Sequence, residues 1–99
     1  MSKSVIVSMI ARIERIADTA PRARSEEELR SLGSQAMGTA IAIKEEFEEH
    51  GISTESSRMR RLLEELDSPY ECDLSELRRI LQIGLHQVAG YYRGLAERL

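Results

Sequence analysis

Apolar residues recur at helical spacing in four segments of this chain, and no segment keeps the alternation of apolar and polar residues that marks a strand. The segments are residues 3–20, 25–51, 54–67 and 74–98. Because apolar side chains three or four positions apart share one face of a helix, each segment has a face to bury. The pattern predicts an all-α single domain over residues 1–99, an antiparallel up-down helical bundle of three long helices and one short helix.

The predicted core is almost entirely aliphatic, since the chain has no Trp and only four Phe and Tyr residues. Each helix contributes one apolar stripe. The four stripes are Val5, Ile6, Met9, Ile10, Ile13, Ile16, Ala17 and Ala20; Leu29, Leu32, Ala36, Ala40, Ile43 and Phe47; Met59, Leu62, Leu63 and Leu66; and Leu77, Leu81, Leu85, Val88, Tyr92, Leu95 and Leu99.

Capping residues mark several of the predicted helix ends. Ser25 followed by Glu28, and Asp73 followed by Glu76, have the spacing of a capping box, in which two side chains satisfy free N–H groups at a helix start. Gly51 is placed to end the second helix, because glycine readily adopts the left-handed conformation of a helix C-cap.

The charge balance limits the classes of partner. With 14 basic and 17 acidic residues, the net charge of −3 provides no field to attract nucleic acid or an anionic membrane surface. No stretch approaches the roughly 20 apolar residues of a membrane span, and no signal peptide is visible. The single Cys72 forms no intrachain disulfide. We therefore expect a cytoplasmic protein with no nucleic-acid or membrane partner.

Residues 31–43, "SLGSQAMGTAIAI", carry no charge although 31% of the chain is charged. Opposite the main stripe of this helix lie the small residues Ser31, Ser34, Gly38 and Ala42, so a second helix can approach closely there. Glycine inside a helix costs about 1 kcal/mol relative to alanine. Gly33 and Gly38 therefore indicate a packing benefit.

The last helix has a similar second face. Ile83, Gly90 and Gly94 lie away from its main stripe, and the two glycines have the small-xxx-small spacing of closely packed helices. Helices with two such faces are either central in the bundle or in contact with a partner chain. We expect a partner chain, most simply a homodimer, with interface residues Gly38, Ala42, Ile83, Gly90 and Gly94.

Two short acidic patterns provide an alternative. Residues 45–49, "EEFEE", match EExxE, and residues 64–67, "EELD", match ExxD. This pair resembles the motifs of the MazG family of all-α nucleotide pyrophosphohydrolases. The resemblance implies that carboxylates hold Mg²⁺ for phosphate hydrolysis. The ligands would be Glu45, Glu46, Glu49, Glu64 and Asp67. The other interpretation of the acidic run is the solvated end of a long helix.

A second enzymatic alternative involves the last helix. Arg79 and His86, with six residues between them, resemble the Arg-x4-6-His signature of HEPN ribonucleases, which are small all-α dimers. The resemblance implies that this pair handles a 2′-hydroxyl and the scissile phosphate. The simpler interpretation is an exposed histidine on a polar helix face.

These observations favour a non-enzymatic function. We predict no catalytic residue, no metal ligand and no cofactor. The leading hypothesis is a small acidic protein–protein interaction module of the adaptor, chaperone or regulator type, which acts as a helical dimer and binds another protein through a helix groove or the edge of its dimer. In size and charge it resembles secretion chaperones and anti-activators.

Overall fold

The structure, a computed structural model, describes residues 2–54 and 73–99. Its elements are helix α1 (Ser2–Thr19), the 3-10 turn η1 (Ala20–Arg22), helix α2 (Glu26–Glu49) and helix α4 (Leu74–Ala96). No strand occurs in these residues, which confirms the predicted helical class for the three long helices. The predicted short helix over 54–67 lies outside the described residues from 55 onward.

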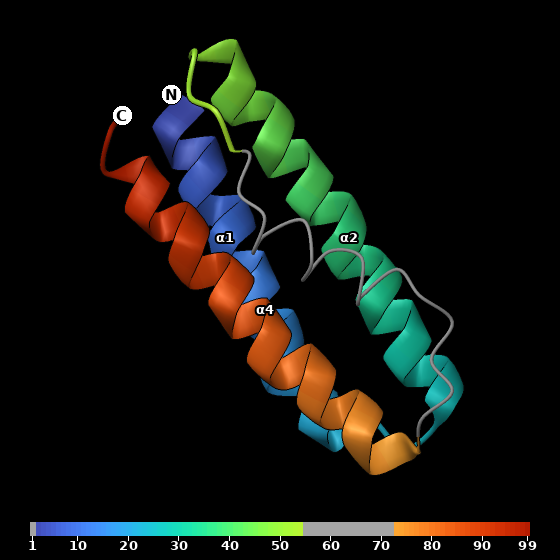
Figure 1. Cartoon of the computed structure of the whole chain (residues 1–99). Helices are drawn as coiled ribbons and strands as arrows, with labels where there is room; N and C mark the ends of the chain where they lie inside the picture. The colour runs from blue at the N-terminus through green and yellow to red at the C-terminus, as the bar shows by residue number, and fades with distance from the viewer. Residues whose placement is uncertain (1, 55–72) are drawn as a thin grey trace.

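The three helices pack side by side (Figure 1). The chain descends through α1, turns at η1, ascends through α2, and ascends again through α4, so that α1 is antiparallel to both neighbours and the two termini lie at the same end. None of the described helices is long and apolar enough to cross a membrane.

The core lies where the three stripes meet, and most of the predicted stripe residues are buried in it. The largest of them without exposed surface are Tyr92, Phe47, Ile6, Ile10, Ile13, Leu29, Ile43 and Val88. Two predicted core residues are instead exposed, Val5 at 50% and Leu99 at 37%. Val5 is rotated by about 100° from the buried Ile6 on the same helix turn, and Leu99 follows the end of α4. Neither can reach the core from these positions.

The N-caps of α2 and α4 are the predicted residues. Ser25 Oγ accepts a hydrogen bond from the Glu28 N–H at 3.1 Å, and Asp73 Oδ1 accepts one from the Glu76 N–H at 2.8 Å. The Glu28 carboxylate accepts from the N–H of Arg24, one residue before the cap, at 3.0 Å. Both caps therefore use side chains within three residues of the N–H groups that they satisfy.

The C-terminus of α2 has the Schellman arrangement that the glycine predicts. Gly51 adopts φ of 74°, its N–H donates to the Glu48 carbonyl at 3.0 Å, and the Ile52 N–H donates to the Phe47 carbonyl at 3.0 Å. Ile52 packs against the core. The left-handed conformation needs glycine at this position, because a side chain there would be strained.

Polar contacts set the register between α4 and the segments before α2. Three side chains of α4 reach partners that lie progressively earlier in the chain as α4 advances. The contacts are Arg78 with the Ala23 carbonyl at 2.7 and 3.1 Å, His86 Nε2 with Asp18 Oδ1 at 3.1 Å, and Arg93 with Glu14. This order is possible only for antiparallel helices, and it opposes a slip by one helical turn.

Helices α2 and α4 meet at Gly33. This glycine is buried, and a Cβ built on it would lie 3.5 Å from Leu81 Cδ2, an ordinary packing distance. Further along, the Tyr92 hydroxyl donates to the Ala40 carbonyl at 3.3 Å, and the Tyr92 ring stacks on Phe47 with 5.8 Å between ring centroids. Gly33 therefore lies inside the bundle at a position where a Cβ would also fit, so the predicted packing benefit of this glycine stays a prediction.

Candidate functional site

The predicted interface residues lie at the surface of the described bundle. Gly38, Ile83, Gly90 and Gly94 are exposed, and Ala42 is half-buried. A Cβ built on any of the three glycines meets nothing within 4 Å. The packing of α1, α2 and α4 therefore leaves both predicted interface faces accessible to a partner.

The first surface, which we call the α2 outer face, consists of Ser31, Ser34, Gly38, Ile41 and Ala42. It lies opposite the buried stripe of α2 and contains no charge. Ile41 is 48% exposed, an apolar side chain that projects between small neighbours. Such a face allows close approach of a helix backbone and offers one apolar anchor.

Carboxylates flank the α2 outer face at both ends. Glu27 lies one turn before it, and Glu45 and Glu49 lie after it on the same side of the helix. The neighbouring cations Arg30 and Lys44 form ion pairs with other glutamates of the helix. The three flanking carboxylates make no ion pair with the described part of the chain.

The second surface, which we call the α4 outer face, carries Ile83, Gly90 and Gly94 at its centre, with Arg79 and Glu97 toward its ends. Ile83 is 47% exposed, and Arg79, Gly90, Gly94 and Glu97 are exposed as well. A residue every 100° or so along the helix puts all five on the side opposite the buried stripe. The apolar side chain of Ile83 therefore lies about two turns before Gly90 and about three turns before Gly94, the two positions without side chains.

The α2 and α4 outer faces are separate surfaces. Each lies opposite the stripe with which its own helix enters the common core, so the two faces point away from each other. The structure thus divides the predicted interface residues into two sets, Gly38 with Ala42 and Ile83 with the two glycines of α4.

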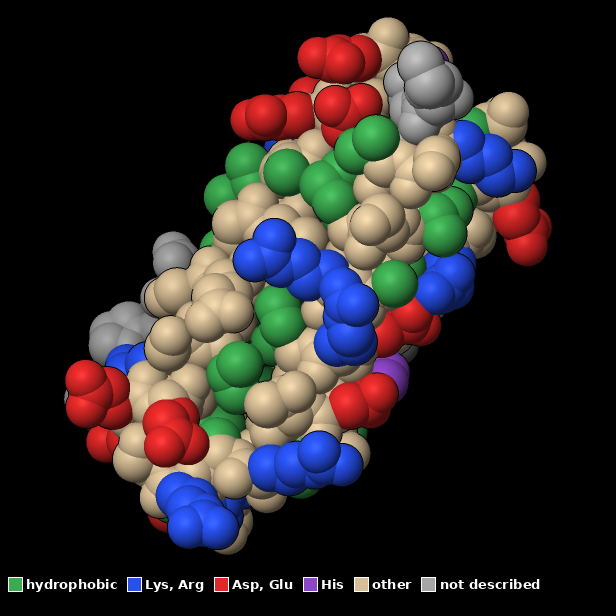
Figure 2. All heavy atoms as spheres, turned by 180° about the vertical axis from the view of Figure 1, so that it is seen from behind, with side chains coloured by type: hydrophobic (Ala, Val, Ile, Leu, Met, Phe, Trp, Pro, Cys, Tyr) green, Lys and Arg blue, Asp and Glu red, His purple; other side chains and the backbone are tan. Residues whose placement is uncertain are grey.

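The acidic end of α2 does not form a metal site by itself. Glu45 and Glu49 are exposed and Glu46 is half-buried, and Figure 2 shows acidic side chains gathered at the end of the molecule where α2 ends. Among the described residues no three His, Cys, Asp or Glu side chains lie close enough to hold a metal ion. Glu64 and Asp67, the other predicted ligands, lie outside the described residues.

Arg79 and His86 have separate partners. Arg79 Nη2 lies 3.8 Å from Glu76 Oε1, and His86 Nε2 lies 3.1 Å from Asp18 Oδ1 on α1. Both side chains are exposed on the surface of α4, and neither is among the described residues that line the pocket between the end of α1 and the start of α2. The Arg79 contact lies within α4, and the His86 contact joins α4 to α1.

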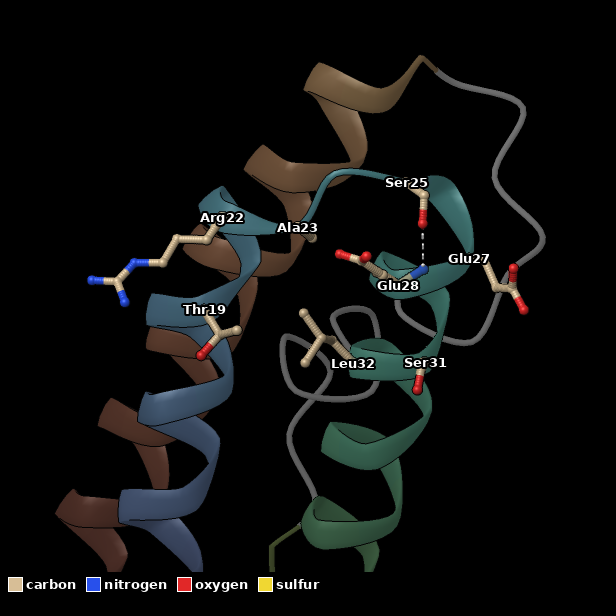
Figure 3. Close-up of a pocket in the computed structure, with 8 residues that line it drawn as sticks. All are labelled: Thr19, Arg22, Ala23, Ser25, Glu27, Glu28, Ser31 and Leu32. Atoms are coloured by element: carbon tan, nitrogen blue, oxygen red, sulfur yellow. Dashed lines mark hydrogen bonds between the residues drawn. The ribbon is translucent and has the colours of Figure 1, made fainter.

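An open pocket with a volume of about 500 Å³ lies between the end of α1 and the start of α2. Leu32 points into it, whereas Arg22 and Glu27 extend away from it (Figure 3). Its inner polar groups are already engaged, since Ser25 caps α2 and Thr19 Oγ1 donates to the Arg15 carbonyl at 2.8 Å. The residues that line it are Thr19, Arg22, Ala23, Ser25, Glu27, Glu28, Ser31 and Leu32. Among the described residues that line it, no pair of free polar groups converges for acid–base chemistry.

Three residues of the outer faces were not predicted to lie there. Ile41 and Glu97 had no predicted role, and Arg79 was predicted only as the partner of His86 in the ribonuclease alternative. Ile41 was detectable as the large apolar residue off the stripe of α2. Arg79 and Glu97 lie 18 residues apart, which is five full turns at about 3.6 residues per turn, so the helical period alone puts them on one edge.

Comparison with known proteins adds no assignment to this geometry. No family model, no curated protein and no solved structure matches the chain.

Proposed function

We propose that the chain is a small protein–protein interaction module that acts as a helical dimer in the cytoplasm and docks a helix of another protein on its α2 outer face. The observation that carries this proposal is the exposed, uncharged face of α2 in a chain of which 31% is charged. Solvated helix faces normally carry charges, whereas faces that pack against another helix do not. An adaptor, chaperone or regulator needs such a face and no catalytic group.

The α2 outer face specifies the chemistry of its partner. Ser31, Ser34 and Gly38 let a second helix approach to about 8–10 Å between axes, and the exposed Ile41 needs an apolar contact. The flanking carboxylates are separated by about 18 to 22 residues, or roughly 27–33 Å along the helix. The partner is therefore a helix with small or apolar residues at its centre and Lys or Arg at both ends.

A second copy of α2 does not fit this face. Antiparallel pairing around Gly38 puts Glu27 of each copy opposite Glu49 of the other. Parallel pairing puts each glutamate opposite itself. Like charges across an interface oppose association, so charge selects a basic partner helix rather than the same helix of a second copy.

A pair of synthetic helical peptides tests the proposal. One has an uncharged Ala/Leu centre with Lys at both ends, and the other has the same centre with Glu at both ends. Fluorescence anisotropy with the whole protein should show binding of the Lys peptide at least tenfold tighter than that of the Glu peptide, weakening as salt increases.

Two variants locate the binding. Ile41→Glu and Gly38→Leu should each weaken binding of the Lys peptide about tenfold or more, because one adds a charge to the face and the other fills it. The matched control is Ile83→Glu, which makes the same change on α4 and should leave peptide binding within about threefold. Equal binding of the two peptides, or wild-type binding by Ile41→Glu, would contradict the proposal.

A further inference from the structure

We infer that the α4 outer face pairs with the same face of a second copy of this chain, in an antiparallel arrangement about a two-fold axis at the level of Val88. This inference rests on the dimer in the proposed function and gives it a surface, an orientation and a register. The α4 outer face has three properties that favour this pairing: an exposed apolar side chain, an adjacent gap, and opposite charges at its ends.

The apolar side chain and the gap fit each other. Ile83 is 47% exposed, and at Gly90 and Gly94 no described side chain lies within 4 Å of a built Cβ. In an antiparallel pair centred at Val88, a residue five positions before the axis lies level with a position five residues after it. Ile83 of one copy is then level with the gap between Gly90 and Gly94 of the other, and the two-fold axis makes the same contact twice.

The charges agree with the same register. Arg79 and Glu97 are each nine residues from Val88, and five full turns of helix put them on the same edge of the face. A two-fold axis that lies in the plane of the interface puts this edge of one copy next to the same edge of the other copy. Arg79 of each copy therefore meets Glu97 of the other, and two ion pairs form at the ends of the seam.

Other pairings lose one of these matches. Parallel helices put Arg79 opposite Arg79 and Ile83 opposite Ile83, leaving the glycine gap unfilled. Moving the axis to between His86 and Gln87 puts Glu76 opposite Glu97, a contact between like charges. Glu97 makes no ion pair with the described residues, and the Arg79 contact with Glu76 is long, at 3.8 Å, and exposed. Both partners are thus available to a second copy.

Exchanging the two charges tests the register. Dimer dissociation constants are measured by sedimentation equilibrium for wild type, Arg79→Glu, Glu97→Arg and the double variant. Each single change puts two like-charged pairs into the seam and should weaken the dimer about tenfold. The double variant restores opposite charges and should return to within about threefold of wild type. Circular dichroism checks that all four proteins are equally helical.

Substitutions at the centre test the surface itself. Ile83→Lys and Gly90→Leu should weaken the dimer more than tenfold, because one adds a charge to the seam and the other fills the gap. The matched control is Ile41→Glu on α2, which should not change the dimer. Circular dichroism again separates loss of pairing from loss of folding.

The possible outcomes separate the inference from the proposed function. A wild-type dimer that none of the α4 variants weakens overturns the assignment to α4 and leaves a dimer formed elsewhere. Single variants that weaken the dimer, with no recovery in the double variant, overturn the antiparallel register. A wild-type monomer at every concentration overturns both this inference and the dimer of the proposed function, whereas the docking of a partner helix on α2 is decided by the peptides.

Discussion

Replacing Tyr92 by Phe should destabilise the folded protein near pH 8 and stabilise it at strongly alkaline pH. The Tyr92 side chain has no exposed surface, its hydroxyl donates to the Ala40 carbonyl at 3.3 Å, and burial raises its pKa to about 12. At about pH 8 the variant keeps the ring and its stacking on Phe47 but loses one neutral hydrogen bond. The free energy of unfolding should fall by about 1 kcal/mol.

At alkaline pH the same phenol becomes a disadvantage. In the unfolded chain Tyr92 ionises near its ordinary pKa of 10.0, whereas in the folded chain it resists ionisation until about pH 12. The stability that depends on the neutral phenol is fully present below pH 10 and is lost as the pH rises through the folded value. Two pKa units correspond to a loss of about 2.7 kcal/mol when complete. Phe has no such dependence.

The assay is urea unfolding of wild type and Tyr92→Phe, followed by far-ultraviolet circular dichroism. Wild type should be the more stable by about 1 kcal/mol near pH 8, and the variant by about 1 kcal/mol near pH 11.5, with the curves crossing between pH 10 and 11. Comparing two proteins that differ only at this phenol cancels the titration of Lys and Arg. A stability difference that keeps its sign and size over this range would refute the argument, because it would mean that the phenol ionises equally in both states.

Three further predictions concern the helix contacts. Arg78→Ala should lower the free energy of unfolding by about 1–2 kcal/mol in urea titrations, because its guanidinium donates twice to a carbonyl 55 residues earlier; Arg78→Lys should recover only part of this loss. Ser25→Ala and Asp73→Ala should each cost about 1 kcal/mol, whereas Gly at either position should cost only a few tenths. The hydrogen bond from Arg93 lowers the pKa of Glu14, so wild type should exceed Glu14→Gln in stability above about pH 4.5 and lose that advantage as the pH falls through the lowered value.

The sequence predicts those parts of the fold that depend on neighbouring residues. Ser25 and Gly51 mark the ends of α2 because each cap uses groups within five residues. The contact of Arg78 with Ala23 was not predictable, because it joins segments whose distance depends on how the helices pack. Val5 shows the same limit, since helical spacing puts it beside the stripe and only packing decides which neighbour is buried.

The α2 outer face was predictable from the sequence, whereas the separation of the two candidate surfaces was not. The lack of charge over residues 31–43 identified the α2 outer face directly, because it is a property of consecutive residues. The division into two separate faces depends on the tertiary arrangement and became visible only with α2 and α4 packed on a common core. The EExxE and ExxD interpretation stays a prediction, since two of its five ligands, Glu64 and Asp67, lie outside the described part of the chain.

The outward glycines provide an energetic reason to expect partners on both faces. Gly33 lies inside the bundle, where a Cβ built on it would make an ordinary packing contact with Leu81. Gly38, Gly90 and Gly94 have no such contact among the described residues, yet each costs its helix about 1 kcal/mol relative to alanine, or about 3 kcal/mol together. This is a substantial share of the roughly 5–15 kcal/mol that stabilises a small domain. Among the described residues no close contact at these positions offsets this cost. In the two proposed complexes, helices packed across these positions would offset it through close contact, a basic helix on α2 and a second copy on α4.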